Sequence, residues 1–399
     1  MTASKHWLTE AIRLTMLNLR SAGKRPVIPL IMILGFMAVV LVMILVLSLG
    51  LGLSRTFTHT GSADVAIVMS SGAYSEPESH FDEDQVRAIA SQPGVVQTAH
   101  GALISPEFVT SVSLPKQGSD VDADVVMRGV TANAFRVHAQ IHIIAGRLFN
   151  PGLHEVIVGR QAAQEYQDLQ LGDSIRSDNN TWKVVGIFTA DGGLRESEIW
   201  TDVAGLQAAF HVGDSYSDVY VKLTSPEVIK VFESGIKRDP RLDVAVFSEN
   251  RYFAQIAENY SKIVNNLGIP FAVLMGLGAI VGAVNLMFAS LGTRIRETAL
   301  FRALGFSSLS TTLAMLLEVM VYGLIGGIAA GLIGYLLFDG YQAGTTMGNG
   351  FSQVAFQFVV TPGLLMAGLA FALIMGFLGG LFPTIRAARV PVAKALREI

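Results

Sequence analysis

The sequence has no cysteine and few charged side chains. Among its 399 residues there is no Cys, only 15% are Asp, Glu, Lys or Arg, and the mean hydropathy is +0.47. The absence of Cys excludes disulfides, thiolate metal sites and thiol catalysis. A composition this apolar also excludes an ordinary soluble domain.

Three motifs that carry well-known chemistry are absent as well. No stretch fits the P-loop pattern GxxxxGK[ST], because Gly23 and Lys24 lack both the upstream glycine and the hydroxyl residue that the pattern requires. Neither G-x-S-x-G nor HExxH occurs. We therefore predict no catalytic residue, no metal site and no cofactor bound by this chain, and no ATP hydrolysis through a P-loop of its own.

Long apolar runs are the dominant feature that is present. They cover residues 27–53, 267–292, 309–338 and 361–383. About 20 apolar residues suffice for a helix to cross a hydrocarbon core of ~30 Å. We expect four transmembrane helices over these ranges. The first is too long for the apolar part of a cleaved signal peptide, so it is predicted to remain as an anchor.

The segments between the runs differ in charge. Residues 1–26, 293–308 and 384–399 hold 12 basic and 3 acidic residues, whereas residues 54–266 and 339–360 hold 17 basic and 28 acidic residues. Short basic segments stay on the cytoplasmic side of a membrane. Both termini are therefore predicted to be cytoplasmic, in a multi-pass protein of the bacterial inner membrane. The large domain is predicted to be periplasmic, and its acidity argues against nucleic acid as a partner.

The large segment 54–266 mixes strand and helix patterns. Residues 63–69 and 124–130 predict strands, and residues 82–91 predict a helix that begins with acidic side chains. The order strand, helix, strand, strand is predicted further on, for residues 155–158, 161–166, 173–175 and 183–188. We expect a mixed α+β domain of two lobes, with about 117–212 inserted into a unit made from the flanks.

The N-terminal arm, 1–26, is amphipathic. Residues 5–20 place apolar positions among basic ones, as in a helix that lies on the inner membrane surface. A cytoplasmic helix packed on protein fits the same pattern. Both interpretations are kept.

Glycines recur four residues apart within the apolar runs. This spacing lets helix backbones approach closely in lipid, either in a packed bundle or across a dimer interface. The glycines in question are Gly278, Gly282, Gly323, Gly327, Gly331, Gly376 and Gly380.

The segment RIRETALFRALGFSS, residues 294–308, interrupts two apolar runs with a charged amphipathic helix. Such a helix on a short tether could pass force from a soluble partner into both flanking spans. The alternative is a loop that carries only topology-setting charges.

Three further groups could bind or react. Glu318 lies within an apolar run, where a carboxylate is costly, so it is either a functional group or a hydrogen-bond partner for a neighbouring helix. His138 and His142 are four apart but lack the Glu of a zinc helix. Residues Asp120, Asp122 and Asp124 alternate without the glycine and distal Glu of a calcium loop, so a solvated loop is favoured.

Taken together, these features resemble a family. The order of one span, a large outside domain and three spans is similar to that of the MacB/FtsX-type ABC transporter permeases, the mechanotransmission class. Four segments in the right order resemble family motifs: GRLFNPGLHEVIVGRQAAQEY with LGDSI and WKVVGIF, then RIRETALFRALGFSS, then LEVMVYGLIGGIAAGLIGYLL, and finally LFPTIRAARVPVAKALREI.

The resemblance implies partners for this chain. It implies two copies of an ABC ATPase as a separate polypeptide, which holds ATP and Mg²⁺, and a second permease chain, in a homodimer or a heterodimer, of which we favour the homodimer. A periplasmic adaptor and an outer-membrane channel are further partners in some members. The residues that map onto the ATPase-coupling segment are Arg296, Glu297, Leu300, Arg302, Ala303, Leu304 and Gly305.

The resemblance also implies a function. The expected role is a permease subunit that turns ATP hydrolysis by its partner into a periplasmic conformational change, which exports or extracts a peptide, lipoprotein, lipid or drug. The alternative is an FtsX-like transmitter that activates a periplasmic hydrolase and moves no substrate. FtsX-like chains usually have a smaller outside domain, so the size of segment 54–266 favours transport.

Overall fold

The computed structural model of the protein divides into two compact units. It describes residues 6–389 apart from 24–25, 59, 74, 119–120, 178–179 and 348–350, with backbone alone at 6, 8, 22, 291–298, 342–347 and 351–355. The helical unit comprises Met1–Leu51, Lys262–Tyr341 and Phe358–Ile399, and the sheet unit comprises Gly52–Ser261 and Gln342–Gln357. Each unit is described by itself below.

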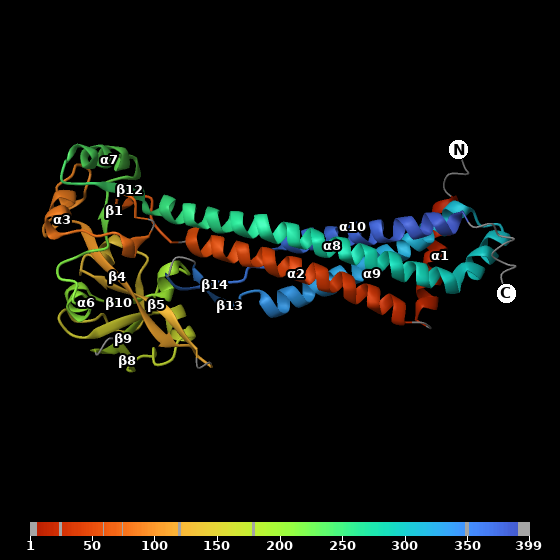
Figure 1. Ribbon diagram of the computed structural model, residues 1–399, viewed down its shortest axis with the longest axis horizontal. Coiled ribbons are helices and arrows are strands. Elements are labelled where there is room, and N and C mark those ends of the chain that lie inside the picture. Colours follow the sequence, from red (N-terminus) through yellow and green to blue (C-terminus); the bar gives the residue numbers. More distant parts are fainter. Residues whose placement is uncertain are drawn as a thin grey trace. The chain divides into compact units, whose positions relative to one another are not determined.

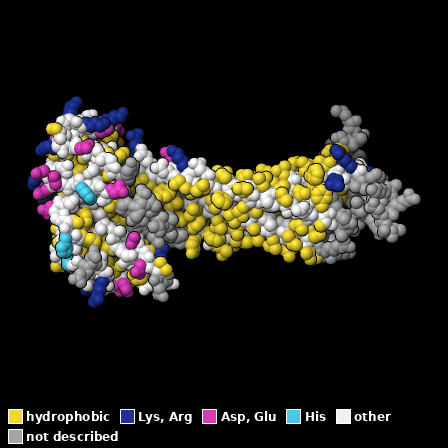
Figure 2. All heavy atoms as spheres, viewed as in Figure 1, with side chains coloured by type: hydrophobic (Ala, Val, Ile, Leu, Met, Phe, Trp, Pro, Cys, Tyr) yellow, Lys and Arg dark blue, Asp and Glu magenta, His cyan; other side chains and the backbone are white. Residues whose placement is uncertain are grey.

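Four long helices make up most of the helical unit. They are α2 (Val27–Thr58), α8 (Glu249–Ala303), α9 (Ser308–Phe338) and α10 (Pro362–Ala388). Each contains a stretch long and apolar enough to cross a membrane. Figure 1 shows these helices, and Figure 2 shows that hydrophobic side chains cover the visible surface along them. The predicted number and order of spans are thus confirmed.

The ends of these helices differ from the predicted limits of the spans. The second span is predicted at 267–292, with residues 249–266 as a helix that leads into it; α8 does begin at Glu249, and it runs on beyond the span to Ala303. The helix extends beyond both ends of the apolar run because no helix-ending residue adjoins the run. Pro270, which lies within the run, does not end the helix either. The segment 339–360, predicted to be a loop, contains the antiparallel hairpin of β13 (Gln342–Met347) and β14 (Phe351–Gln357).

The N-terminal helix α1 (His6–Ala22) packs on α9. Thr15 Oγ1 donates to the Ala314 carbonyl at 3.3 Å, and Ser310 Oγ donates to the Glu10 carboxylate at 2.9 Å. One face of α1 therefore packs on protein, as one of the two interpretations held. Its other face is exposed and apolar, with Ile12, Met16 and Leu17.

A mixed sheet forms the core of the sheet unit. Its ten strands are β1 (Val65–Ser70), β4 (Ile104–Pro115), β5 (Asp122–Val130), β6 (His142–Gly146), β7 (Glu155–Gly159), β8 (Ser174–Ser177), β9 (Asn180–Thr189), β10 (Ile199–Asp202), β11 (Asp218–Lys222) and β12 (Val244–Ser248). The order is β12-β1-β11-β4-β5-β10-β7-β9-β6, with β8 beside β9. A two-stranded ribbon of β2 (Gln97–Thr98) and β3 (Gly101–Ala102) stands apart. The mixed α+β class is confirmed.

The long strand β4 joins two halves of this sheet. Its first residues pair with β11, and its later residues pair with β5. The strands β5 to β10 lie between β4 and β11 in sequence, close to the predicted insertion at 117–212. The two predicted lobes therefore share one continuous sheet instead of forming separate sheets.

Short helices cover each half of the sheet. The half made by β12, β1 and β11 has α3 (Glu83–Ala90) and α7 (Ile229–Arg238) on it, and the other half has α4 (Ala134–Val137), α5 (Arg160–Glu165) and α6 (Val203–Phe210). Three short 3-10 turns complete the unit: η1 (Glu76–Glu78), η2 (Leu194–Ser197) and η3 (Pro226–Val228). The helix α3 begins at a capping box in which Asp82 accepts from Gln85 N, so the acidic start predicted for it has a structural cause.

Glycine packing in the helical unit generates a first prediction. A Cβ at Gly323 would lie 2.8 Å from the Ala372 carbonyl oxygen, and one at Gly326 would lie 2.7 Å from that of Ile33. Gly323→Ala and Gly326→Ala should each lower the midpoint of thermal unfolding in detergent, since overpacking costs about 1–3 kcal/mol. Gly278→Ala, whose Cβ would meet no described atom within 4 Å, is the control and should leave the midpoint unchanged or raise it. An equal loss at all three positions would contradict the packing.

Candidate functional site

The predicted coupling segment, residues 293–308, is not a separate helix. The helix α8 continues through Ala303 and ends in a Schellman motif. Gly305 has φ +102°, the Gly305 amide donates to the Arg302 carbonyl at 3.2 Å, and the Phe306 amide donates to the Phe301 carbonyl at 3.1 Å. The two Phe rings meet edge to face at 6.0 Å. The first strong helix-ending signal after the apolar run is Gly305, which is why α8 and this segment form one rod.

The end of this rod exposes apolar side chains. Leu300 is 54% exposed and Leu304 is 68% exposed, and their spacing of four residues puts them on one helix face. Ala303 and Gly305 are exposed beside them, while Arg302 is half-buried. The side chains of Arg296 and Glu297 lie outside those that the structure describes. Exposed leucines next to basic residues are what a docking surface for a soluble partner needs.

The predicted packing glycines fall into two groups. Gly323 and Gly376 approach the backbone of the facing helix, so α9 and α10 pack closely. Gly327, Gly331 and Gly380 lie against side chains across the same helix pair. A Cβ added at the two remaining glycines, both on α8, would meet no described atom within 4 Å. These two, Gly278 and Gly282, therefore face open space within the described part of this chain.

Glu318 is buried within α9 and has a local partner. The hydroxyl of Tyr322, one turn later on the same helix, donates to Glu318 Oε1 at 2.6 Å. The hydroxyl partner is of the predicted kind, and it lies on the same helix; a partner on a neighbouring helix stays a prediction. The residue is arranged as a hydrogen-bonded structural group.

The other sequence candidates separate in space. His138 is buried at the end of α4, whereas His142 begins β6 and is exposed. Asp122 and Asp124 lie on exposed positions of β5, and Asp120 lies outside the described residues. No cluster of three His, Cys, Asp or Glu side chains with metal-binding geometry occurs among the residues that the structure describes.

A buried charge cluster, which the sequence reasoning missed, lies where the two halves of the sheet meet. It contains acidic and basic side chains from β4, β5, β11, α4, η1, η2 and α8. Its members are Glu76, Glu107, Arg128, His138, Arg195, Glu198, Asp218 and Glu249. The one sequence signal is a charged residue in the apolar strand VVMRGV of β5.

Arg128 is the centre of the cluster. It donates to both oxygens of Glu198 at 2.9 and 3.0 Å, to Glu76 at 2.7 Å and to Glu107 at 3.0 Å. Because Glu107 comes from β4 and Glu198 directly precedes β10, the guanidinium joins both halves of the sheet. A planar fork with five donors suits this bridging better than an ammonium.

Glu249, the first residue of α8, is held at the edge of the cluster. It accepts from Arg195 Nη2 at 2.9 Å and from the Ser62 amide at 2.8 Å, and His138 Nδ1 lies 3.5 Å away. Burial opposes its ionised form, but His138 and Arg195 outweigh burial and lower the pKa of Glu249 to about 2. The carboxylate is therefore charged at neutral pH.

The end of α2 is fastened nearby. The Leu194 amide in η2 donates to Thr60 Oγ1 at 2.6 Å, and Phe57 stacks on Tyr260 of α8 with ring centroids 5.9 Å apart. The adjacent residue Arg195 holds Glu249. The turn η2 thus binds both the end of α2 and the start of α8 to the sheet.

Asp218 is the exception in the cluster. It is fully buried, its Oδ1 has no hydrogen-bond partner among the described residues, and its Oδ2 lies 3.5 Å from Arg128 Nη1. Burial first, and then the nearby Glu76, raise the pKa of Asp218 well above its usual value. Folding therefore takes up a proton at this residue.

This proton uptake predicts the effect of Asp218→Asn. A raised folded-state pKa means that the contribution of Asp218 to stability is fully present below about pH 4 and is lost as the pH rises through the folded-state value. Asp218→Asn should therefore raise the free energy of unfolding at pH 7, by about 1–3 kcal/mol, and much less at pH 4. Denaturant titrations at both pH values measure this. A loss of stability at pH 7 that is no smaller than at pH 4 would contradict the assignment.

Comparisons with known proteins agree with this architecture. The MacB-like periplasmic core domain family matches residues 30–238, and the FtsX-like permease C-terminal family matches residues 269–392. The chain is 22% identical over 346 residues to the uncharacterized ABC transporter permease YknZ of Bacillus subtilis (strain 168), covering 82% of each chain.

Two further proteins are similar over part of their own length or of this chain. The macrolide export ATP-binding/permease protein MacB 1/2 of Paracoccus denitrificans (strain Pd 1222) is 24% identical over 332 residues, which cover 78% of this chain and 46% of that protein. The periplasmic region of MacB from Actinobacillus actinomycetemcomitans matches 50% of this chain and 94% of that structure, at 12% identity and a TM-score of 0.37. The match to the MacB-like periplasmic core domain covers just over half of the chain. This chain therefore belongs to the ABC transporter permeases of the MacB/FtsX type.

Proposed function

We propose that this permease is a mechanical transmitter, driven by a partner ATPase on the cytoplasmic side and acting through its sheet unit on the outer side. One observation carries the proposal. The helix α8 is a single rod of 55 residues, whose first residue is Glu249 in the buried charge cluster and whose last turn is the coupling segment. A displacement at one end of such a rod reaches the other end.

The inner end of the rod has the features of a docking surface. Leu300 and Leu304 are exposed on one face, and the rigid turn at Gly305 leads directly into α9, which begins at the cap Ser307. A partner that grips this turn moves α8 and α9 together. The proposed partner is an ABC ATPase, in two copies, which binds ATP and Mg²⁺.

A buried ion pair holds the outer end of the rod in place. Moving Glu249 alone would break its buried ion pair with Arg195, and breaking a buried pair costs about 3–5 kcal/mol. Movement of α8 is therefore transferred to the sheet unit. The inserted half of the sheet is the part expected to move, because η2, which holds Glu249, belongs to it.

Several polar side chains in the membrane helices form hydrogen bonds within their own helix. Ser48 and Thr384 donate back to carbonyls of their own helices, and Glu318 is bonded to Tyr322. Among the described side chains of the helical unit, no buried polar atom lacks a hydrogen bond. We infer that cargo is moved on the outer side instead of along a polar path between these helices. The cargo class proposed is a peptide, lipoprotein, lipid or drug.

The proposed assembly is a homodimer of this chain in the bacterial inner membrane, with both termini in the cytoplasm. A periplasmic adaptor and an outer-membrane channel are the further partners proposed for export. The four apolar helices and the acidic sheet unit support this orientation. The FtsX-like match over residues 269–392 keeps activation of an external hydrolase as the second candidate.

A docking variant tests the inner end of the rod. Leu304→Glu places a charge where an apolar contact is proposed, so it should lower the affinity for the ATPase at least tenfold in a pulldown from detergent. Glu297→Lys should abolish the stimulation of ATP hydrolysis by the permease. Arg389→Gln, at the end of α10, is the matched control and should change neither quantity. Unaltered binding and stimulation in both test variants would refute ATPase docking at this segment.

A second variant tests the outer end. Because the chain has no Cys, spin labels introduced at Arg176 and Ser234 report the distance between the two halves of the sheet without interference. ATP should change this distance in the permease–ATPase complex, and Glu249→Gln should abolish the change while ATP hydrolysis stays within about twofold. Glu155→Gln, which removes an ion pair with Arg147 at 2.6 Å outside the cluster, is the control.

The labelling experiment tests two points separately: whether the buried charge cluster transmits movement, and whether the permease transmits movement at all. A full ATP-dependent distance change in the Glu249→Gln complex would show that the buried charge cluster does not transmit movement. No distance change in any complex, with hydrolysis intact, would reject mechanical transmission altogether.

A further inference from the structure

An unpaired sheet edge lies beside a groove in the sheet unit. Strand β12 is the last strand of the sheet, and β1 is its one strand partner within the described part of the chain. Exposed edges offer unpaired N–H and C=O groups to another strand. The groove beside this edge has a volume of about 460 Å³.

The backbone geometry shows which groups face outward. The Ser71 amide donates to the Asp243 carbonyl at 3.0 Å, so the backbone of Asp243 points toward β1. Residues alternate along an antiparallel pair, and the register of β12 continues unbroken from this point. Val244 and Val246 therefore present their N–H and C=O groups to the free side of the strand, whereas the carbonyl of Ser248 belongs to the start of α8.

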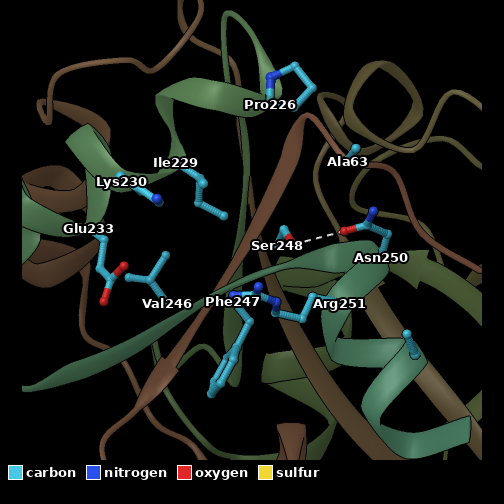
Figure 3. A pocket seen from close by; sticks show the side chains of 11 residues that line it. Ala63, Pro226, Ile229, Lys230, Glu233, Val246, Phe247, Ser248, Asn250 and Arg251 are labelled. Atoms are coloured by element: carbon cyan, nitrogen blue, oxygen red, sulfur yellow. Dashed lines mark hydrogen bonds between the residues drawn. The ribbon is translucent and has the colours of Figure 1, made fainter. Parts of the chain in front are cut away.

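The groove has one wall from β12 and one from α7. Figure 3 shows Ile229, Lys230 and Glu233 of α7 on the same side as Val246 of β12, while the Phe247 side chain points away from α7. The apolar side chains of the lining, Ile229, Val246 and Phe247, are half-buried. The size suits a short extended segment of three or four residues, since pockets of about 300–1,000 Å³ hold ligands of that order.

The charges on the rim favour an acidic occupant. Lys230 and Arg251 line the groove, and neither forms an ion pair within 4 Å with any described residue. Glu233, the acidic residue of the lining, is neutralised by Lys237 at 2.6 Å. The groove is therefore positive. A second copy of this edge would bring the same cations together, which opposes pairing between two copies.

We propose that β12 receives an extra strand from an acidic, extended segment of another protein on the same side of the membrane. Main-chain hydrogen bonds to Val244 and Val246 would supply affinity, and the two cations would select acidic side chains. This interaction surface is distinct from the coupling segment and the buried charge cluster, and it stands whether or not the proposed mechanical function holds.

Binding of two designed peptides to the full-length chain in lipid nanodiscs tests the proposal. The probes are fluorescein-labelled TVEVDVT and its basic counterpart TVKVKVT, measured by anisotropy. We expect saturable binding of the acidic peptide with a Kd in the micromolar range and at least tenfold weaker binding of the basic peptide. Hydrogen exchange at residues 244–248 should slow when the acidic peptide is bound.

Charge-reversal variants locate the site. The double variant K230E/R251E should weaken binding of TVEVDVT at least tenfold. The double variant R176E/R238E makes the same change in net charge at positions outside the groove, so it should leave the Kd within about twofold. Val246→Pro removes one outward N–H at an edge position, and it should weaken binding without abolishing the fold.

Three results would overturn the proposal. They are no saturable binding of TVEVDVT, equal binding of both peptides, and equal losses in the two double variants. A fourth result would change the identity of the binding partner. If Ser248→Cys chains form disulfide-linked pairs that the acidic peptide prevents, the edge pairs with a second copy of this chain, and the assignment to an acidic partner is wrong.

Discussion

The ion pair between Glu249 and Arg195 is the contact on which the rest of the sheet unit depends. It attaches the first residue of α8 to η2, and the Leu194 amide of η2 also donates to Thr60, just after the end of α2. Since α8 continues as one helix to Ala303, the attachment at Glu249 decides whether a movement of the rod reaches the sheet. A hydrophobic contact at this place would not fix the position of α8, because hydrophobic attraction is non-directional. A buried, hydrogen-bonded carboxylate fixes that position.

The charge cluster is costly for a domain that needs only to be stable. Replacing buried ion pairs by apolar side chains is often neutral or stabilising, so their presence is weak evidence for a role in stability. Burial and the nearby Glu76 raise the pKa of Asp218 well above its usual value, so this carboxyl adds to the cost of the cluster. What the cluster does provide is direction: Arg128 fixes strands from both halves of the sheet in a single geometry. This specific geometry, and not added stability, is what the cluster contributes to the sheet unit.

Sequence reasoning captured the features that depend on local patterns. The four spans, the capped helix α3 and five of the ten strands of the sheet follow from apolar periodicity and capping residues, which act over a few positions. It missed the buried charge cluster because its pairs, such as Glu76 with Arg128 and Arg195 with Glu249, join residues that are distant in sequence and meet only through the sheet topology. The separate coupling helix was wrong for a local reason. Within segment 293–308, the left-handed conformation that ends a helix occurs at Gly305, which follows the charged residues.

The packing of the helical unit explains why α8 can serve as the moving element. The pair α9 and α10 is held by close backbone approach at Gly323 and Gly376, and 44% of the apolar stretch of α9 is buried. For α8 the corresponding share is 17%, and a Cβ at Gly278 or Gly282 would meet no described atom within 4 Å. Close contacts on the flank of α8 do occur, at Gly276, where a Cβ would lie 2.7 Å from Phe371, and at Ala283, which a Cβ at Gly379 would approach to 2.8 Å. A helix is stiff along its axis because of its hydrogen bonds. In the proposed function, the movement of α8 is therefore limited by these few flank contacts and by the buried ion pair of Glu249 at its start.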